Sequence, residues 1–277
     1  MRRLAADYPV QLLCEVVDVP PSTYYYQSQK RDDLDLRAAM ETIAVQHPRY
    51  GSRRLTQELR REGWQVNRKR IQRLMQEENL LVQVRRYCRT TNSEHGYGRY
   101  PNLIKHLEIV KPDQVWCADL TYIRLPRQFV YLAVILDIFT RSIRGWELAG
   151  TMLESLPKAV LERALAKGHP AIHHSDQGVQ YAATSYTSLL QAAQVQISMS
   201  ARGRPTENAF AERFMRTLKE EEVSLNEYED MADARRHLTH FLDQVYQHKR
   251  MHSSLGYLTP AEFEAHWNAG FIETSDS

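Results

Sequence analysis

The sequence of 277 residues contains only three cysteines, and they lie far apart, at Cys14, Cys88 and Cys117. An odd and scattered set indicates neither a disulfide framework nor a cysteine-based zinc site. The chain also lacks the run of about 18 apolar residues that a membrane-spanning helix needs, and its first residues lack the apolar core of a signal peptide. We therefore expect a cytoplasmic protein with no membrane partner.

The net charge is small, at +2, but it is unevenly distributed. Residues 49–89 contain twelve Arg or Lys against four Glu, a net charge of +8, so the remainder of the chain sums to −6. A local excess of positive charge is the usual electrostatic footprint of a nucleic-acid-binding surface. Helices whose lysines and arginines merely face solvent have the same composition, so charge alone leaves both interpretations open.

Helices are predicted in the first ~110 residues, because few β-branched residues alternate there. Prolines limit three of these helices, at residues 9–17, 21–27 and 33–46. Ser52 can cap a fourth helix that closes at Gly63, and Asn67 can cap a fifth. The apolar positions of the fifth helix recur at helical spacing and are expected to be buried: Ile71, Leu74 and Met75.

This pattern is typical of a small helix-turn-helix bundle whose last helix enters a groove of DNA. Arginines and lysines on its polar faces are placed to meet DNA phosphates. The alternative is a purely structural bundle. The predicted DNA-contacting residues are Arg53, Arg54, Arg68, Lys69, Arg70 and Arg73.

Beyond residue 114 the chain becomes rich in Val, Ile, Tyr, Trp and Thr. Three successive strands are predicted, joined by short turns that favour antiparallel pairing, at residues 114–125, 129–140 and 142–148. Helices and strands then alternate, at residues 153–166 (helix), 170–174 (strand), 182–194 (helix), 195–199 (strand) and 207–223 (helix). This order of elements is the one expected of a ribonuclease H-like α/β fold with a mixed five-stranded sheet and flanking helices.

The chain is accordingly expected to contain five segments. They are an N-terminal helical segment (1–30), a helix-turn-helix-like DNA-binding domain (31–84), a linker (85–112), a ribonuclease H-like core (113–225) and a C-terminal helical extension (226–277). The linker is predicted from its glycines, its prolines and its weak periodicity. The last residues, 273–277, are expected to form a disordered tail.

Three acidic side chains lie in three different predicted elements. Asp119 lies in a strand-like run, Asp176 follows a short apolar step, and Glu212 lies inside a helical run, 35 residues separating the last two. Hard divalent cations such as Mg²⁺ prefer oxygen ligands, and phosphoryl transfer on nucleic acids commonly uses two such ions about 4 Å apart. Two strand-borne aspartates and a helix-borne glutamate can supply that site.

Helix geometry favours Glu212 over the neighbouring acids. At about 100° per residue, Asn208 and Lys219 fall within about 40° of Glu212, on one stripe of the helix. Glu207 falls about 140° away, where it suits the positive end of the helix dipole. Asn208 is then predicted to support the metal site and Lys219 to contact DNA phosphate, although Lys219 could equally be an ordinary solvent-exposed lysine. The other rival acids are also off this stripe: Glu220 and Glu221.

Other polar and aromatic residues of this region have simpler interpretations. Asp137, at the end of a strand, is predicted to hydrogen-bond the following turn. His173 and His174 precede Asp176, and structural roles are favoured because no third suitably spaced ligand indicates zinc. The face of the last helix opposite Glu212 is predicted to pack on the sheet or core through Phe210 and Phe214.

Six motifs, in this order, resemble the B-frame, integrase-type portion of transposases of the bacterial IS-three insertion-sequence family. Two of them are similar to the family's helix-turn-helix segment, three to its catalytic blocks and one to its closing motif. They cover residues 47–54, 66–75, 116–123, 174–181, 207–214 and 246–260.

The resemblance implies a D-D-E integrase catalytic core, with Asp119, Asp176 and Glu212 as catalytic and metal-binding residues and Lys219 at the family's basic position. It implies an enzyme that cleaves and joins double-stranded DNA at the terminal inverted repeats of the element and at target DNA. Two Mg²⁺ ions are expected, with Mn²⁺ as a substitute, and so is a homo-oligomer on DNA.

Two departures from the family pattern stand out. The family usually has Asp where this chain has Glu207, and no heptad zipper of an A-frame product precedes the motifs. The chain is therefore expected to be the B-frame product, acting with an A-frame partner or as a frameshift fusion. Two alternatives stay open: a catalytically silent DNA-binding regulator, and a hydrolytic nuclease of the ribonuclease H type.

Overall fold

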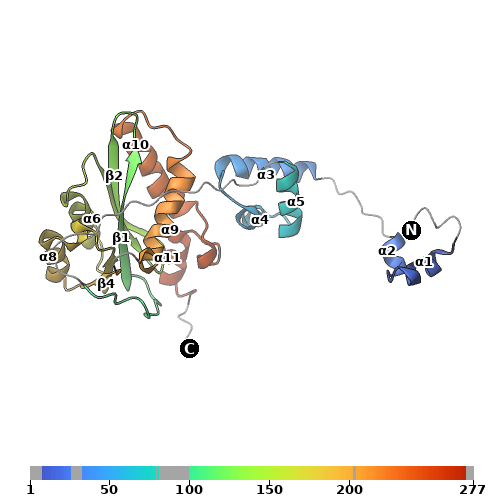
Figure 1. The fold of residues 1–277 in the computed structure, drawn as a ribbon, viewed down its shortest axis with the longest axis horizontal. Coiled ribbons are helices and arrows are strands. Elements are labelled where there is room, and N and C mark those ends of the chain that lie inside the picture. The colour runs from blue at the N-terminus through green and yellow to red at the C-terminus, as the bar shows by residue number, and fades with distance from the viewer. Residues whose placement is uncertain (1–7, 26–32, 79, 81–99, 202–203, 273–277) are drawn as a thin grey trace. The chain divides into compact units, whose positions relative to one another are not determined.

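The computed structural model describes residues 8–25, 33–78, 80, 100–201 and 204–272 (Figure 1). The predicted tail and much of the predicted linker lie outside these residues. By its internal contacts the chain divides into two compact units, Met1–Ile43 and Ala44–Ser277. The five-segment organisation stays a prediction.

The first unit contains the helices α1 (Val10–Val16) and α2 (Pro21–Tyr25) and most of α3 (Leu34–Gln46). These bounds agree closely with the helices predicted from the proline pattern. Cys14, on α1, is a buried free thiol.

The second unit begins with the helices α4 (Ser52–Arg61) and α5 (Arg68–Glu77), which contact each other. Asn67 caps α5 as predicted, its side chain accepting the backbone N–H of Arg70 at 2.8 Å. The predicted cap of α4 is wrong, because Gly51 occupies the N-cap position and Ser52 is the first helical residue. Gly63 follows α4 with a φ of +92°, a left-handed conformation that glycine adopts without strain. The apolar stripe of α5 is buried as predicted: Ile71, Leu74 and Met75.

The centre of the second unit is a five-stranded sheet in the order β3-β2-β1-β4-β5 (Figure 1). β1 pairs antiparallel with β2, and β2 with β3, as predicted from their short connections. β4 pairs parallel with both β1 and β5. The mixed sheet with flanking helices confirms the predicted fold class. The strand bounds are Val115–Arg124 (β1), Phe129–Asp137 (β2), Ile143–Ala149 (β3), Ile172–Ser175 (β4) and Gln196–Met199 (β5).

Helices cover both faces of this sheet, and successive residues of β1 supply both cores. Val115 and Cys117 pack in a cluster with side chains from α9 (Ala209–Leu218) and α10 (Met231–Thr239). Trp116 and Ala118 pack in the other, with side chains from α6 (Ser155–Leu165) and α8 (Thr184–Ala192). The remaining helical segments are α7 (Val179–Ala182), η1 (Pro205–Asn208), η2 (Lys219–Val223), η3 (His240–Tyr246), η4 (Ser253–Leu255) and α11 (Pro260–Asn268).

The helix predicted at residues 207–223 is helical throughout but changes type twice. A 3-10 turn, η1, leads into α9, and the π-helical segment η2 follows it. None of the helices that the structure describes is both long and apolar enough to cross a membrane.

Candidate active site

Asp119 and Asp176 are brought side by side by the parallel pairing of β1 and β4. The register aligns Cys117 with His174, so two residues further along each chain the two aspartates lie at the same level. Asp119 is half-buried, and its Oδ1 accepts the backbone N–H of Leu120 at 2.8 Å. Adjacent strands lie about 4.8 Å apart, and Asp176 is close enough for its charge to add to the rise that burial causes in the pKa of Asp119.

A tight turn fixes the Asp176 carboxylate. Its Oδ1 accepts the backbone N–H of Gly178 at 2.9 Å. A Cβ atom added at Gly178 would lie only 2.9 Å from the same oxygen, so a larger residue would have to displace the carboxylate. A side chain at position 178 would therefore press on the Asp176 carboxylate.

Asn208 and α9 bring Glu212 to the two aspartates. The Asn208 side chain is buried and donates from Nδ2 to the backbone oxygen of Ala118 at 3.3 Å, next to Asp119. Asn208 is the N-cap residue of α9, and Glu212 lies one turn further along, in the first turn of the helix. The Oδ1 atom of Asn208 is buried with no hydrogen-bond partner. A buried oxygen without a donor is costly, and a cation would satisfy it.

The pKa of Asp119 depends on burial and on the neighbouring acids. Burial, reinforced by the negative charges of Asp176 and Glu212, raises the pKa of Asp119 to about 7, and the Lys219 ammonium opposes the rise. Like charges held close together disfavour ionisation, and a bound cation would reverse this effect. Among the residues that the structure describes, no three His, Cys, Asp or Glu side chains are already arranged as a metal site. The donor chemistry, which is oxygen only, nevertheless fits Mg²⁺ or Mn²⁺.

Lys219 begins η2, on the same helical run as Glu212. Its Nζ lies over the ring of Tyr122 on β1, 5.2 Å from the ring centre. The charge is thus held beside Asp119, Asp176 and Glu212, which we call the acid cluster. It is close enough to lower the pKa of Asp119. Its predicted contact with DNA stays a prediction.

Glu207, the nearest rival of Glu212, is engaged elsewhere. Its carboxylate accepts the backbone N–H of Ala201 at 2.7 Å and the Nδ2 of Asn102 at 3.1 Å. This agrees with the expectation that Glu207 faces away from Glu212. The predicted packing on the sheet edge or core is confirmed for Phe214, which is buried in the core. Phe210 lies outside the core: it is 39% exposed, and the guanidinium of Arg141 lies over its ring.

Asp137, His173 and His174 have the structural roles that the sequence favoured. Asp137 accepts the backbone N–H of Thr140 at 2.7 Å in the turn after β2. The buried ring of His173 pairs with the hydroxyl of Tyr186, and burial lowers the pKa of His173 to about 3. His174 is likewise hydrogen-bonded, and burial lowers its pKa to about 4. Both rings are therefore neutral at physiological pH.

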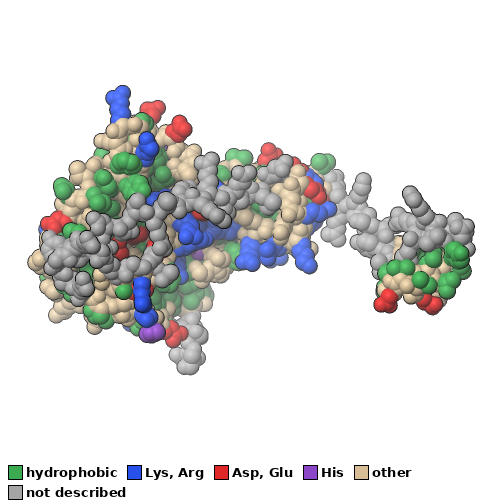
Figure 2. Space-filling view, viewed as in Figure 1, with side chains coloured by type: hydrophobic (Ala, Val, Ile, Leu, Met, Phe, Trp, Pro, Cys, Tyr) green, Lys and Arg blue, Asp and Glu red, His purple; other side chains and the backbone are tan. Residues whose placement is uncertain are grey.

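The predicted DNA-contacting residues lie on α4 and α5, where lysine and arginine side chains gather in Figure 2. Arg70 is half-buried, and the guanidinium of Arg54 is already bound within the chain. The remaining four are exposed to solvent: Arg53, Arg68, Lys69 and Arg73.

A largely buried charge cluster, formed by Arg54, Glu221 and Arg250, left no pattern in the sequence; we call it the arginine clasp. Arg250 grips Glu221 with two hydrogen bonds, Nε to Oε2 at 2.6 Å and Nη2 to Oε1 at 2.8 Å. Arg54, from α4, binds Oε1 of the same carboxylate at 3.2 Å. The two arginines hold the pKa of Glu221 below its usual value despite burial.

The arginine clasp joins two of the motifs that carried the family resemblance. Arg54 lies in residues 47–54 and Arg250 in residues 246–260. Beside it, the Tyr50 hydroxyl donates to the backbone oxygen of Lys249 at 3.1 Å. The motifs themselves were visible in the sequence, but their contact is a property of the fold.

Models of known protein domains match most of this chain. Models of the integrase core domain match residues 110–205 and 193–260, and a model of an HTH-like domain matches residues 30–87. The chain is 37% identical to the transposase for insertion sequence element IS904 of Lactococcus lactis subsp. lactis, over 78% of this chain and 87% of that protein.

Two further relatives match over nearly their full length. The chain is 36% identical to an uncharacterized 31 kDa protein of insertion element IS600 of Shigella sonnei, over 91% of this chain and 97% of that protein. It is 28% identical to the transposase InsF for insertion sequence IS3A of Escherichia coli K12, over 94% of this chain and 95% of that protein.

Proposed function

Because the chain belongs to the IS3 (IS-three) family of insertion-sequence transposases, we propose that it cleaves and joins DNA through Asp119, Asp176 and Glu212. Membership of the integrase and transposase family implies polynucleotidyl transfer. The assignment of that chemistry to these three carboxylates is supported by one observation above all. The negative charges of Asp176 and Glu212 add to the effect of burial in raising the pKa of Asp119, so acids from β1, from the residue after β4 and from α9 share one electrostatic environment.

The three carboxylates, with the unpartnered Oδ1 of Asn208 beside them, would hold two Mg²⁺ ions, for which Mn²⁺ can substitute. When bound, such ions activate water or a DNA 3′-hydroxyl and stabilise the leaving oxygen of an in-line displacement at phosphorus. The protein's part is to fix geometry: paired strands hold Asp119 and Asp176, and Asn208 ties the start of α9 to β1. Lys219 places a positive charge beside the acids, where it can meet a DNA phosphate.

The DNA partners follow from the same proposal. The exposed basic side chains of α4 and α5 would bind the terminal inverted repeats of the element, and the acid cluster would act on those ends and on target DNA. Two ends must be held together for joining, so the active species is a homo-oligomer on DNA. An A-frame partner, or a fusion to it, would complete recognition of the ends.

A strand-transfer assay tests this function. Purified protein and Mg²⁺ are incubated with labelled DNA carrying the terminal repeats and a free 3′-hydroxyl, and joined products are resolved on a gel. We expect joining by the wild type, loss of joining in Glu212→Gln, and full activity in Glu220→Gln, a matched change at a rival acid further along the same helical run.

The other outcomes separate the alternatives. Cleavage without joining by the wild type indicates a hydrolytic nuclease. DNA binding without cleavage, even with an A-frame partner supplied, indicates a regulator. Full joining by Glu212→Gln would show that the catalytic glutamate lies elsewhere.

A further inference from the structure

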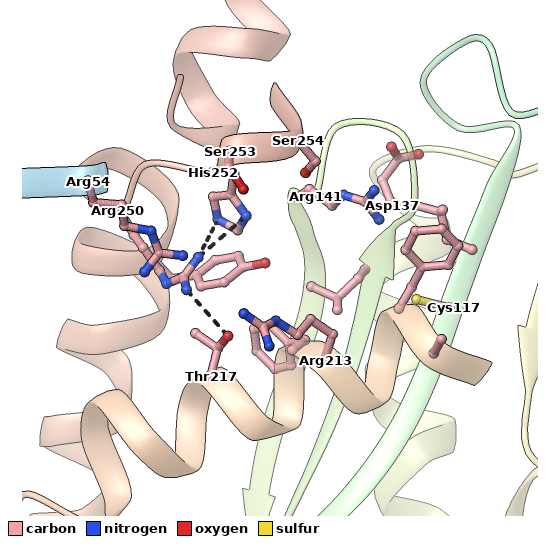
Figure 3. A pocket seen from close by; sticks show the side chains of 16 residues that line it. Arg54, Cys117, Asp137, Arg141, Arg213, Thr217, Arg250, His252, Ser253 and Ser254 are labelled. Atoms are coloured by element: carbon pink, nitrogen blue, oxygen red, sulfur yellow. Dashed lines mark hydrogen bonds between the residues drawn. The ribbon is translucent and has the colours of Figure 1, made fainter. Parts of the chain in front are cut away.

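A second positively charged site lies on the side of α9 that carries Arg213 and Thr217. It is a pocket of about 370 Å³ between α9, the end of β2 and the segment around η4 (Figure 3). Phe210, Phe214 and Tyr246 form much of its apolar wall. Its polar lining is dominated by guanidinium and hydroxyl groups, from Arg54, Arg141, Arg213, Arg250, Ser253 and Ser254.

The positive charge of this pocket exceeds the negative charge around it. Glu221 forms ion pairs with Arg54 and Arg250 in the arginine clasp. Asp137, the one acid among the lining residues, accepts hydrogen bonds from the turn after β2 and from the backbone N–H of Asp113. Within the described residues, no carboxylate lies at ion-pair distance from Arg141 or Arg213. Two guanidinium groups therefore remain available to an anion.

Arg141 is held in this position at a cost. It has a φ of +63°, which is uncommon for any residue other than glycine, asparagine or aspartate. Its guanidinium is partly buried over the Phe210 ring, 4.3 Å from the ring centre, and burial lowers its pKa. Strained backbone and a desolvated charge without a carboxylate partner together point to a ligand rather than to stability.

We propose that this pocket binds a phosphate group of the DNA backbone, at a site separate from the acid cluster. Guanidinium forks match phosphate oxygens with paired hydrogen bonds, and the exposed hydroxyls of Ser253 and Ser254 can donate further ones. The pocket volume is roughly twelve times the volume that one water molecule occupies in the liquid. The pocket therefore has room for a phosphodiester and part of its nucleotide. DNA as the source of the phosphate rests on the proposed function.

The charged and titratable groups facing the pocket agree with an anion. His252 lines the pocket beside Arg250, and burial together with the surrounding arginines lowers its pKa to about 2, so it is neutral. The acid cluster lies on a different stripe of α9, because Arg213 follows Glu212 by one residue and so by about 100°. A DNA strand bound here would approach the catalytic helix from its side rather than along the carboxylates.

The test measures binding, not chemistry. Affinity of the full chain for labelled terminal-repeat DNA is measured by fluorescence anisotropy in EDTA over a series of NaCl concentrations, for the wild type, Arg141→Gln, Arg213→Gln and Arg163→Gln. Arg163 is the matched control, because it is exposed on α6, over the opposite face of the sheet. Circular dichroism and melting curves establish that each variant is folded.

We expect Arg141→Gln and Arg213→Gln each to weaken binding about tenfold and to reduce the slope of log K against log salt by up to about 0.9, the value for one phosphate contact. Arg141→Lys should recover part of the loss. Arg163→Gln should bind like the wild type. Wild-type affinity and slope in a folded Arg213→Gln protein would overturn the proposal, whatever the behaviour of Arg141→Gln.

A second arm identifies the source of the phosphate and separates this inference from the proposed function. Melting curves in inorganic phosphate and in chloride at equal ionic strength should show stabilisation of the wild type by phosphate and none of Arg141→Gln, with DNA abolishing the difference. Stabilisation that DNA does not displace would overturn DNA as the ligand. If the wild type binds DNA through this pocket but joins no strands, the proposed function is wrong and the pocket proposal stands.

Discussion

Asp119 and Glu221 are both withdrawn from solvent in the same unit, yet their carboxyl groups shift in opposite directions. Burial, reinforced by the charges of the two further acids beside it, raises the pKa of Asp119 to about 7. The arginine clasp lowers the pKa of Glu221, because two guanidinium groups grip it. The carboxylate of Glu221 is paired with arginines of the fold, whereas that of Asp119 stands among like charges.

The two carboxylates differ in whether their partners belong to the protein. A buried acid that is already paired contributes to structure, and its removal leaves its partners uncompensated. A buried acid among like charges is unfavourable by itself, and the cation that we propose would relieve this cost. Glu212 and Glu221 are nine residues apart on one helical run, so the helix connects both environments.

The largest expected effect is on the rate of strand transfer, when one acid of the cluster is removed. Asp119→Asn should lower the rate of strand transfer by at least about a thousandfold, because removing one anionic ligand weakens metal binding and misplaces the reacting groups. The same change should leave DNA binding in EDTA within about threefold of the wild type. Single-turnover joining and anisotropy measure the two. Equal losses in both would show that Asp119 supports the fold instead.

The next effect is on stability, at the arginine clasp. Glu221→Gln should lower the free energy of unfolding by about 3 kcal/mol, because Arg250, only 3% exposed, loses its counter-charge. Glu227→Gln, an exposed acid, is the control and should change little. Urea denaturation at pH 7 measures the difference.

The pH dependence of that loss has a definite sign. The folded pKa of Glu221 is lowered, so its contribution is present above the usual value of 4.5 and is lost as the pH falls through the lowered value. The difference in the free energy of unfolding between wild type and Glu221→Gln should therefore become smaller in acid. A gap that stays constant down to pH 3 would mean that the lost contribution is not electrostatic.

A smaller effect is expected at the turn that fixes Asp176. Gly178→Ala places a Cβ 2.9 Å from the Asp176 Oδ1 and should displace the carboxylate, reducing strand transfer at limiting Mg²⁺ about tenfold. Gly51→Ala is the matched control, because nothing lies within 4 Å of its added Cβ. The activity is measured across a Mg²⁺ titration. A Gly178→Ala enzyme with an unchanged Mg²⁺ dependence would show that the turn yields without moving the carboxylate.

Much of the fold followed from local patterns in the sequence. The strands of the sheet, the cap at Asn67 and the buried stripe of α5 depend on neighbouring residues, so periodicity and capping rules predict them. The stripe that carries Asn208 and Glu212 followed from helix geometry in the same way.

The features that escaped prediction depend on distant contacts. Arg54 looked like a DNA-contacting residue from its own helix, and only the fold brings it to Glu221. Phe210 was expected on the sheet edge or in the core, and only the fold shows that Arg141, in the turn after β2, lies over its ring. Long-range pairing of charges leaves no period in a sequence, which is why the arginine clasp and the arginine-lined pocket appeared only in three dimensions.

The smallest expected effect is on the melting temperature of Asp119→Asn, and it separates the two carboxylates most clearly because its sign changes when Mg²⁺ is added. In the metal-free protein the raised pKa of Asp119 means that the native state loses stability relative to the unfolded chain as the pH rises from about 4 to about 7. Asp119→Asn removes that loss, so its melting temperature should exceed that of the wild type by ~3 °C or more at pH 8, and by less at pH 5. Saturating Mg²⁺ should reverse the order, because only the wild type gains from binding the ion. Calorimetry in EDTA and in Mg²⁺ measures both, with Glu227→Gln as the control. A variant less stable than the wild type in EDTA at pH 8 would show that the Asp119 carboxylate is balanced within the chain, as that of Glu221 is.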